Sequence, residues 1–283
     1  MSDTNTTGTP QPPRITFSVS WAFAAAFIAL IVVIAVAIML SRDSGRDDAR
    51  EPAAAPPETG EAVSGFYSSF TDLWGNVILR PVNPEGEPHD LNPSRDWEAG
   101  QPITAPVGIE WQLTAYGSLP FSGDGPYQVG DCRAKGYSRT PQGAALAAVQ
   151  LRARSNWCDS SSGAGLIDEQ LVTLDLRNRV QPVEDSVRAH VIAGWRQHAA
   201  ELDAEGVTRS QAAQYVNYKY DAFRVERFDR NRAAIDVAGR LSDHQWLVAR
   251  LHVVWHDGDW KYIPDAVERL QDLNALGEGW VQW

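Results

Sequence analysis

The chain has 283 residues, enough for one good-sized domain with a membrane anchor or for two small domains. Its formal net charge at pH 7 is −11, and Lys occurs only at positions 135, 219 and 261. A protein that binds nucleic acid through the phosphates needs a concentrated basic surface. Direct nucleic-acid binding is therefore not expected.

Residues 17–40 form an uninterrupted apolar run without a charged side chain. A bilayer core of ~30 Å needs ~20 helical residues, so the run is long enough to span it. A cleaved signal peptide is the alternative, but its apolar region is only ~7–15 residues long and has a basic start. The run predicts a single transmembrane helix, preceded by a disordered cytoplasmic tail (1–16) and followed by a flexible stalk (41–65) rich in Pro, Ala and Asp.

The orientation of this helix depends on two opposing signals. Arg42, Arg46 and Arg50 follow the run, which by a strict positive-inside count places the C-terminal side in the cytoplasm. Cys132 and Cys158, both downstream, are typical of an exported domain with one disulfide, although two free buried thiols are the alternative. We expect an extracytoplasmic C-terminal domain in the cell membrane, with Cys132 bonded to Cys158.

Residues 66–80 are the first stretch after the stalk that is able to fold. Residues 81–106 contain six prolines, a density that excludes a helix or a central strand and predicts an irregular arm or a linker. Whether this arm belongs to the fold is left open by the sequence. Residues 107–116 alternate as a strand does, and 117–126 read as a loop.

The stretch 141–155 predicts a helix that is buried on most sides. Thr140 is a good N-cap, and Pro141 stands at the first helical position, where its missing N–H costs nothing. Small side chains allow neighbouring backbone to come close. The capping and packing motif comprises Thr140, Pro141, Gly143, Ala144, Ala147 and Ala148. The segment from Cys132 to the cap is long enough to run back along the helix and meet Cys158.

The remainder of the chain changes from helical to strand periodicity. A second helix is expected at 184–206 and a short third one at 208–216. Asp257-Gly258 is a strong hairpin signal. The predicted class is α+β, with four strands at 220–228, 232–241, 245–255 and 259–264.

Helices followed by a curved antiparallel sheet that ends in "VVWHDGDWKYIP" resemble the NTF2-like cone fold. The resemblance implies an NTF2-like domain over residues 107–283. One anchor with such a domain outside looks like the VirB8/TcpC class of conjugation proteins, which are bitopic scaffolds of type IV secretion channels.

A narrower resemblance rests on "WQLTAYGSLPFSGDGP", "GYSRTPQGAALAAVQLRAR" and the same "VVWHDGDWKYIP". These blocks resemble an uncharacterised family of actinobacterial membrane-anchored proteins that travels with conjugative or integrative elements. The resemblance implies a non-catalytic scaffold of an envelope complex. Its implied partners are further copies of itself and other subunits of a secretion channel, with the anchor in the membrane.

The chain shows no motif of known catalytic or metal chemistry. It lacks His-Glu-x-x-His, Cys-x-x-Cys and Gly-x-Ser-x-Gly, so we expect no enzyme, no metal and no cofactor. An acid–base reaction in a cone pocket would recruit Asp221, Asp236 and Tyr218, but no spacing brings two titratable groups together. Strand alternation can place Asp236 on the solvent face.

The sequence contains eleven tryptophans, which is an unusually high number. Those at 111, 195, 246 and 255 lie in regular elements and are expected in the core. Trp97, Trp280 and Trp283 lie in irregular segments and are candidate partner contacts, because exposed Trp is typical of interface hot spots. The alternative is that the arm and the tail fold back and bury them. A cell-surface module that binds a ligand in the cone pocket is the alternative function.

Overall fold

The computed structural model of the chain describes residues 65–89, 97–98, 100–159, 161–207 and 219–283. The chain divides into two units, Met1–Pro56 and Pro57–Trp283, and every described residue lies in the second. The tail, the apolar run at 17–40, nearly all of the stalk and the short helix expected at 208–216 lie outside the described residues.

The described residues do not bear out the expected membrane-spanning helix, and the apolar run that predicted it lies outside them. In the described part of the chain, no helix is long and apolar enough to cross a membrane. The longest helix there, α4 (Asp185–Glu205), carries acidic and basic side chains along its length. The expected single-pass protein of the cell membrane with an extracytoplasmic domain therefore finds no support in the part of the chain that the structure describes.

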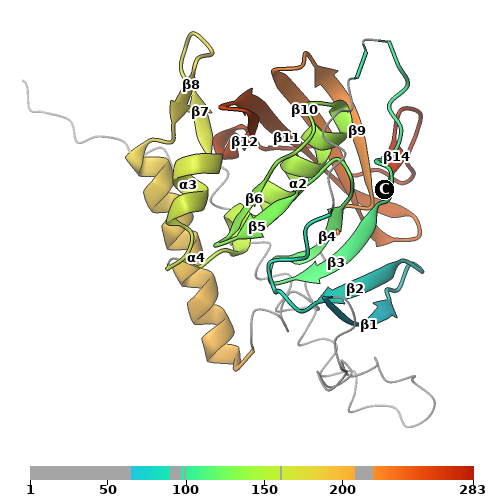
Figure 1. The fold of residues 1–283 in the computed structure, drawn as a ribbon, viewed down its shortest axis with the longest axis horizontal. Coiled ribbons are helices and arrows are strands. Elements are labelled where there is room, and N and C mark those ends of the chain that lie inside the picture. The colour runs from blue at the N-terminus through green and yellow to red at the C-terminus, as the bar shows by residue number, and fades with distance from the viewer. Residues whose placement is uncertain (1–64, 90–96, 99, 160, 208–218) are drawn as a thin grey trace, which may run out of the picture. The chain divides into compact units, whose positions relative to one another are not determined.

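Most of the regular structure is β-strand, arranged in two main sheets and two short hairpins (Figure 1). The four-stranded sheet has the order β1-β2-β3-β4 and contains Phe66–Thr71, Val77–Pro81, Glu110–Thr114 and Gly117–Phe121. The larger sheet has the order β12-β11-β10-β9-β14, with β13 also pairing with β11. Its strands are β9 (Ala222–Phe228), β10 (Arg232–Ser242), β11 (Gln245–His256), β12 (Asp259–Tyr262), β13 (Glu268–Arg269) and β14 (Val281–Gln282).

Helix α2 (Pro141–Trp157) lies at the centre of the domain, between strands of the larger sheet and strands β4 and β6 (Figure 1). Alanine at five of its 17 positions leaves room for neighbouring backbone, and 13 of the residues are buried. The two short hairpins pair β5 (Gln128–Gly130) with β6 (Arg133–Lys135), and β7 (Val172–Leu174) with β8 (Val180–Pro182). Helix α3 (Ala164–Gln170) follows α2 and also contacts β6 and β12.

The predicted NTF2-like cone is wrong. Six strands precede α2, whereas the cone requires helices first and one curved sheet afterwards. The segment 117–126, expected as a loop, begins with β4, whose five residues are all buried. Helix α4 does not lie within a curved sheet, because only its residues Trp195 and Leu202 are buried. The domain is a mainly β structure built around one buried helix.

The four C-terminal strands were predicted correctly within a few residues. Asp257 and Gly258 both have positive φ, 51° and 79°, which is the conformation of the tight turn that their sequence indicates. Pairing of β2 with β3 places residues 77–81 in the same sheet as residues 110–114. Strands on both sides of the proline-rich arm therefore belong to one sheet.

The C-terminal segment wraps around the larger sheet. It leaves from β13 at one edge of β11 and ends at β14, which pairs with the far edge of β9. Between these strands it covers part of the outer sheet face. Its Leu270, Leu273, Leu276 and Trp280 pack against Ala222, Ala238, Trp246 and Val248.

Gly143 is required by a close backbone contact at the start of α2. Thr140 caps the helix by accepting a hydrogen bond from the Gly143 N–H at 3.0 Å. A Cβ on Gly143 would lie closer than 3.0 Å to the carbonyl oxygen of Ser138, where real Cβ atoms are essentially never found. This contact explains why the capping and packing motif contains glycine at this position.

Gly143→Ala is expected to lower the free energy of unfolding by about 2 kcal/mol, because the helix start must shift to admit the methyl group. Gly194→Ala is the matched control, since Gly194 is an exposed helical glycine with nothing within 4 Å of the added Cβ. That variant should gain up to about 1 kcal/mol from helix propensity. Urea unfolding of the full chain measures both. Equal effects of the two substitutions would contradict the close contact at Gly143.

Candidate functional site

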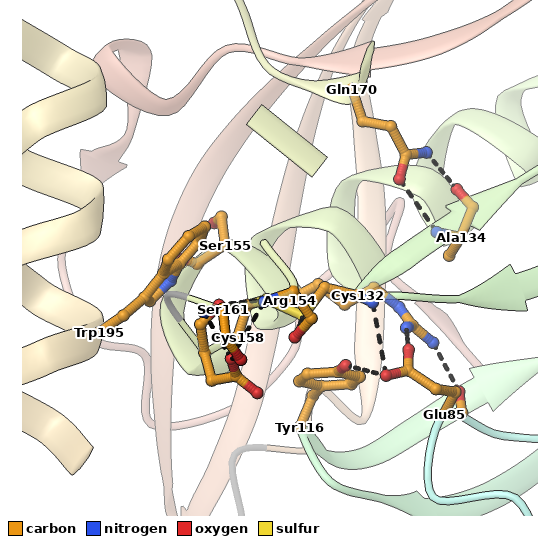
Figure 2. The surroundings of a disulfide bond; sticks show 12 residues. Glu85, Tyr116, Cys132, Ala134, Arg154, Ser155, Cys158, Ser161, Gln170 and Trp195 are labelled. Carbon is orange, nitrogen blue, oxygen red and sulfur yellow. Dashed lines mark hydrogen bonds and ion pairs between the residues drawn. A yellow bond between two sulfur atoms is a disulfide. The ribbon is translucent and has the colours of Figure 1, made fainter. Parts of the chain in front are cut away.

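The disulfide predicted from the sequence joins Cys132 to Cys158 (Figure 2). Cys132 lies in the turn between β5 and β6, and Cys158 is the C-cap of α2, its N–H donating to the carbonyl of Arg154 at 3.0 Å. Both cysteines are buried. The bond ties the β5–β6 hairpin to the end of the central helix.

A buried ion pair lies beside this disulfide (Figure 2). The fully buried Arg154 donates from Nη1 to Glu85 Oε2 and from Nη2 to the Glu85 carbonyl oxygen, each at 2.7 Å. Its guanidinium lies over the ring of Tyr116, 4.6 Å from the centroid, and the Tyr116 hydroxyl donates to Glu85 Oε1. Burial raises the pKa of Tyr116 well above its usual value, so the hydroxyl remains a donor.

Glu85 shows that the first part of the proline-rich arm belongs to the fold. It reaches α2 across 69 positions of sequence. Next to it, Glu87 and Gln112 exchange two hydrogen bonds, from the Glu87 N–H to Gln112 Oε1 at 2.7 Å and from Gln112 Nε2 to the Glu87 carbonyl at 2.9 Å. The sequence did not identify Glu85. The sequence signal for such a partner was Arg154, which lies in a helix rich in small side chains. A buried arginine is ordinarily paired with a carboxylate.

The three tryptophans proposed as partner contacts all pack on the domain itself and remain partly exposed. Trp97 lies edge-to-face on Phe228, with ring centroids 5.0 Å apart. Trp280 lies under the guanidinium of Arg224, and Trp283 packs on Phe223 at 4.5 Å. Trp97 thus lies at one end of β9, while Trp280 and Trp283 lie near its other end, so the three do not form one surface.

Trp283 instead belongs to a different group of aromatic side chains, which surrounds a small pocket of about 90 Å³. We call this the tryptophan pocket. It is built where the β1–β2 turn, β3, the ends of the larger sheet and the C-terminal strand meet. It is lined by Trp74, Asn76, Trp111, Asp221, Arg240, Trp246, Gln282 and Trp283.

A buried lysine, Lys219, contacts two of the residues that line the tryptophan pocket, Asp221 and Trp111. Lys219 Nζ binds Asp72 Oδ2 at 2.8 Å and Asp221 Oδ1 at 2.7 Å, and lies 4.6 Å from the ring centroid of Trp111. Asp72 also accepts from the N–H of Trp74, which fixes the turn that presents the indole. Burial alone would raise the pKa of Asp72, but hydrogen bonds from Lys219 and Asn76 outweigh it and hold the pKa below its usual value.

Arg240 lies between two of these indoles. Its guanidinium carbon is 5.0 Å from the ring centroid of Trp74 and 4.8 Å from that of Trp246. Both indoles make cation–π contacts with the guanidinium, and its Nε is buried without a hydrogen-bond partner. Next in sequence to these residues are Leu73 and Leu241, whose side chains are 91% and 53% exposed. The tryptophan pocket therefore contains one cation between two indoles, and the chain neighbours of Trp74 and Arg240 are exposed leucines.

Asp236, the carboxylate that an acid–base reaction would recruit, is fully buried and not on a solvent face. It lies directly across the strands from Arg224 and Arg250. Arg250 Nε donates to it at 2.6 Å and Arg224 Nη2 at 2.7 Å. Burial would raise the pKa of Asp236, but the two arginines outweigh it and keep the pKa below the ordinary value of 3.8. The group is a structural ion pair and not a poised acid.

Asp236→Asn is expected to cost about 2 kcal/mol of unfolding free energy near neutral pH, less than a fully buried pair because Arg224 and Arg250 retain contact with water. A depressed carboxyl pKa adds stability that is complete above the pKa of the unfolded chain and is lost as the pH falls through the folded one. The difference between wild type and variant should therefore shrink below about pH 4. Urea unfolding at pH 5 and pH 2 measures it, and an unchanged difference would contradict the ion-pair account.

The other residues considered for acid–base catalysis or metal binding do not form a cluster among the described residues. Tyr218 lies outside the described residues, and Asp221 is engaged by Lys219. Among the residues that the structure describes, no three His, Cys, Asp or Glu side chains are placed to hold a metal ion. The tryptophan pocket was not predicted, because its residues come from segments far apart in sequence and carry no common motif.

Comparison with known proteins identifies a family. The model of the family described as "Domain of unknown function (DUF8175)" matches residues 80–186 and 176–282, and thus the chain from the end of β2 to β14. Neither the search of curated proteins nor that of solved structures found a match. The family match covers more than half of the chain, which therefore belongs to the DUF8175 family.

Proposed function

We propose that the described domain is a non-catalytic assembly subunit that binds other proteins through the tryptophan pocket. The observation that carries the proposal is Arg240 stacked between Trp74 and Trp246 beside the exposed Leu73 and Leu241. Trp and Arg are the residues most enriched at the energetic centres of protein interfaces. Exposed leucines around such a centre supply apolar contact area and exclude water.

The state of the titratable groups supports a binding role over catalysis. A general acid or base needs a free group with a pKa near the working pH. Asp72 and Asp236 are held ionised by cations, and Tyr116 is held protonated by burial. Cationic partners account for the lowered pKa values of the two carboxyl groups, and burial accounts for the raised pKa of Tyr116.

The setting of this assembly is suggested by the sequence resemblance alone. The blocks at 111–126 and 136–154 resemble proteins that travel with conjugative or integrative elements. We therefore propose a conjugative type IV secretion channel as the complex in which partners are sought first. Further copies of the chain are the second class of partner.

Site-specific photo-crosslinking in the cells that make the protein tests the proposal. A photoreactive amino acid replaces Leu241, the chain neighbour of Arg240 in the tryptophan pocket. The matched control places it at Leu176, a leucine at the tip of the β7–β8 hairpin that is more exposed than Leu241 (106% against 53%). Capture of a defined protein from position 241 and not from 176 would support the proposal. Equal capture from both positions, or none from 241, would overturn it.

A second candidate function, small-molecule binding, is favoured by one groove. It measures about 510 Å³ and is lined by Pro88 and the β5–β6 hairpin, including Tyr127, Arg133 and Lys135. This volume lies within the ~300–1,000 Å³ of ordinary ligand pockets, whereas the tryptophan pocket is far smaller. The groove lies on the hairpin surface and is not the interior of a cone. Chemical shifts of the hairpin that respond to a ligand library would favour this role.

A further inference from the structure

Arg240 differs from Arg224 and Arg250, two other half-buried arginines of the larger sheet. Arg224 and Arg250 are both paired with Asp236. The Nε of Arg240 is buried without a hydrogen-bond partner, and no carboxylate of the described residues lies within ion-pair distance of its guanidinium. A partly buried charge without a partner is costly, so such sites ordinarily carry one.

A second donor in the same pocket also has no partner. The indole Nε1 of Trp283 is buried and makes no hydrogen bond within the described residues. Asp221 lines the pocket too, but its oxygens are engaged, Oδ1 by Lys219 and Oδ2 by the backbone N–H of Arg240. Two residues that line the pocket thus carry donors without an acceptor in the described part of the chain.

We infer that the tryptophan pocket receives a carboxylate side chain, Asp or Glu, from an apolar segment of a partner protein. This inference rests on the proposed protein-binding function and names the chemistry of its partner. A guanidinium presents a planar fork of N–H groups, which matches a carboxylate better than any other side chain.

Size and surroundings agree with a single acidic side chain. A pocket of about 90 Å³ is too small for a drug-sized molecule, which needs ~300 Å³ or more. The exposed Leu73 and Leu241 are the chain neighbours of the lining residues Trp74 and Arg240 and would contact apolar residues next to the inserted acid.

The test combines the crosslinker at position 241 with substitutions in the full chain. Arg240→Gln removes the positive charge, and Arg227→Gln, at an exposed arginine of β9, is the matched control. We expect capture to fall about tenfold or more with Arg240→Gln and to stay unchanged with Arg227→Gln. Arg240→Lys keeps the charge without the planar fork, so the amount of captured partner should lie between those of Arg240→Gln and the wild type. Resistance of each variant to protease shows that it is folded.

The crosslinked segment identified by mass spectrometry is then synthesised as a peptide, together with a counterpart in which each Asp or Glu becomes Asn or Gln. Tighter binding of the acidic peptide to wild type, and no preference with Arg240→Gln, would support the inference. Undiminished capture by folded Arg240→Gln, or equal binding of both peptides, would overturn it and leave the proposed function standing. No capture from position 241 in the wild type would overturn both.

Discussion

Glu85→Gln is expected to lower the free energy of unfolding by about 3 kcal/mol, because it leaves the guanidinium of Arg154 buried without a negative charge. Arg154 has no exposed surface, so water cannot replace the lost carboxylate. The backbone carbonyl of Glu85 still accepts one of its hydrogen bonds, which keeps the loss at the lower end of the range for broken buried pairs. Urea unfolding of the full chain measures the change.

Two further variants separate charge burial from simple packing. Arg154→Met should cost less than Glu85→Gln, because the side chain of Glu85 keeps 20% exposure and can be solvated. Combining Arg154→Met with Glu85→Leu should recover much of the loss, since no charge then remains buried. Recovery is not complete, because the Tyr116 hydroxyl loses its acceptor. Additive losses in the double variant would contradict a coupled pair.

Cys158→Ser is expected to lower the free energy of unfolding by about 3–4 kcal/mol, since the disulfide closes a loop of 26 residues in the unfolded chain. In a domain of this size the midpoint of thermal unfolding should fall by on the order of 10 °C. The local loss of stability should be largest where the β5–β6 hairpin contacts α2. Thermal unfolding followed by circular dichroism measures it.

A reducing agent provides the matched control for this variant. Reduced wild type should unfold at nearly the same temperature as Cys158→Ser, because both lack the same cross-link. The reducing agent should leave the variant itself unchanged. A wild-type midpoint that does not respond to reduction would show that the bond contributes little to stability.

The sequence predicted local structure well where the signal was itself local. Thr140 and Pro141 mark the start of α2, and Asp257-Gly258 marks the last hairpin, because capping and turn chemistry act over a few residues. The disulfide was predicted for a similar reason, as only two cysteines exist. These features needed no knowledge of the rest of the fold.

Arrangements that depend on distant pairing were not predicted. Residues 117–121 read as a loop because of Gly, Ser and Pro, yet they form the buried strand β4, where pairing with β3 overrides local propensity. For the same reason the sequence did not identify Glu85, because its partner Arg154 is 69 positions away in the chain. The NTF2-like expectation failed because the sequence predicted only one strand, at 107–116, of the six that precede α2.

The candidate site illustrates the same limit. Trp97, Trp280 and Trp283 were singled out because they lie in irregular segments, but only Trp283 lines the tryptophan pocket. Trp111 and Trp246 are core residues, as predicted, and also form walls of that pocket. Which tryptophans share a surface depends on the register of two sheets, and no spacing in the sequence encodes that.

The most direct test of the binding role is the effect of Trp74→Ala on capture from position 241 in cells. Trp74 lies in a turn and is partly exposed, so its removal should leave the domain folded. A hot-spot tryptophan contributes about 2 kcal/mol or more, which predicts a loss of capture of more than tenfold. Trp157→Ala, at a half-buried tryptophan against His198 and outside the pocket, should leave capture unchanged. Undiminished capture by folded Trp74→Ala would contradict the account.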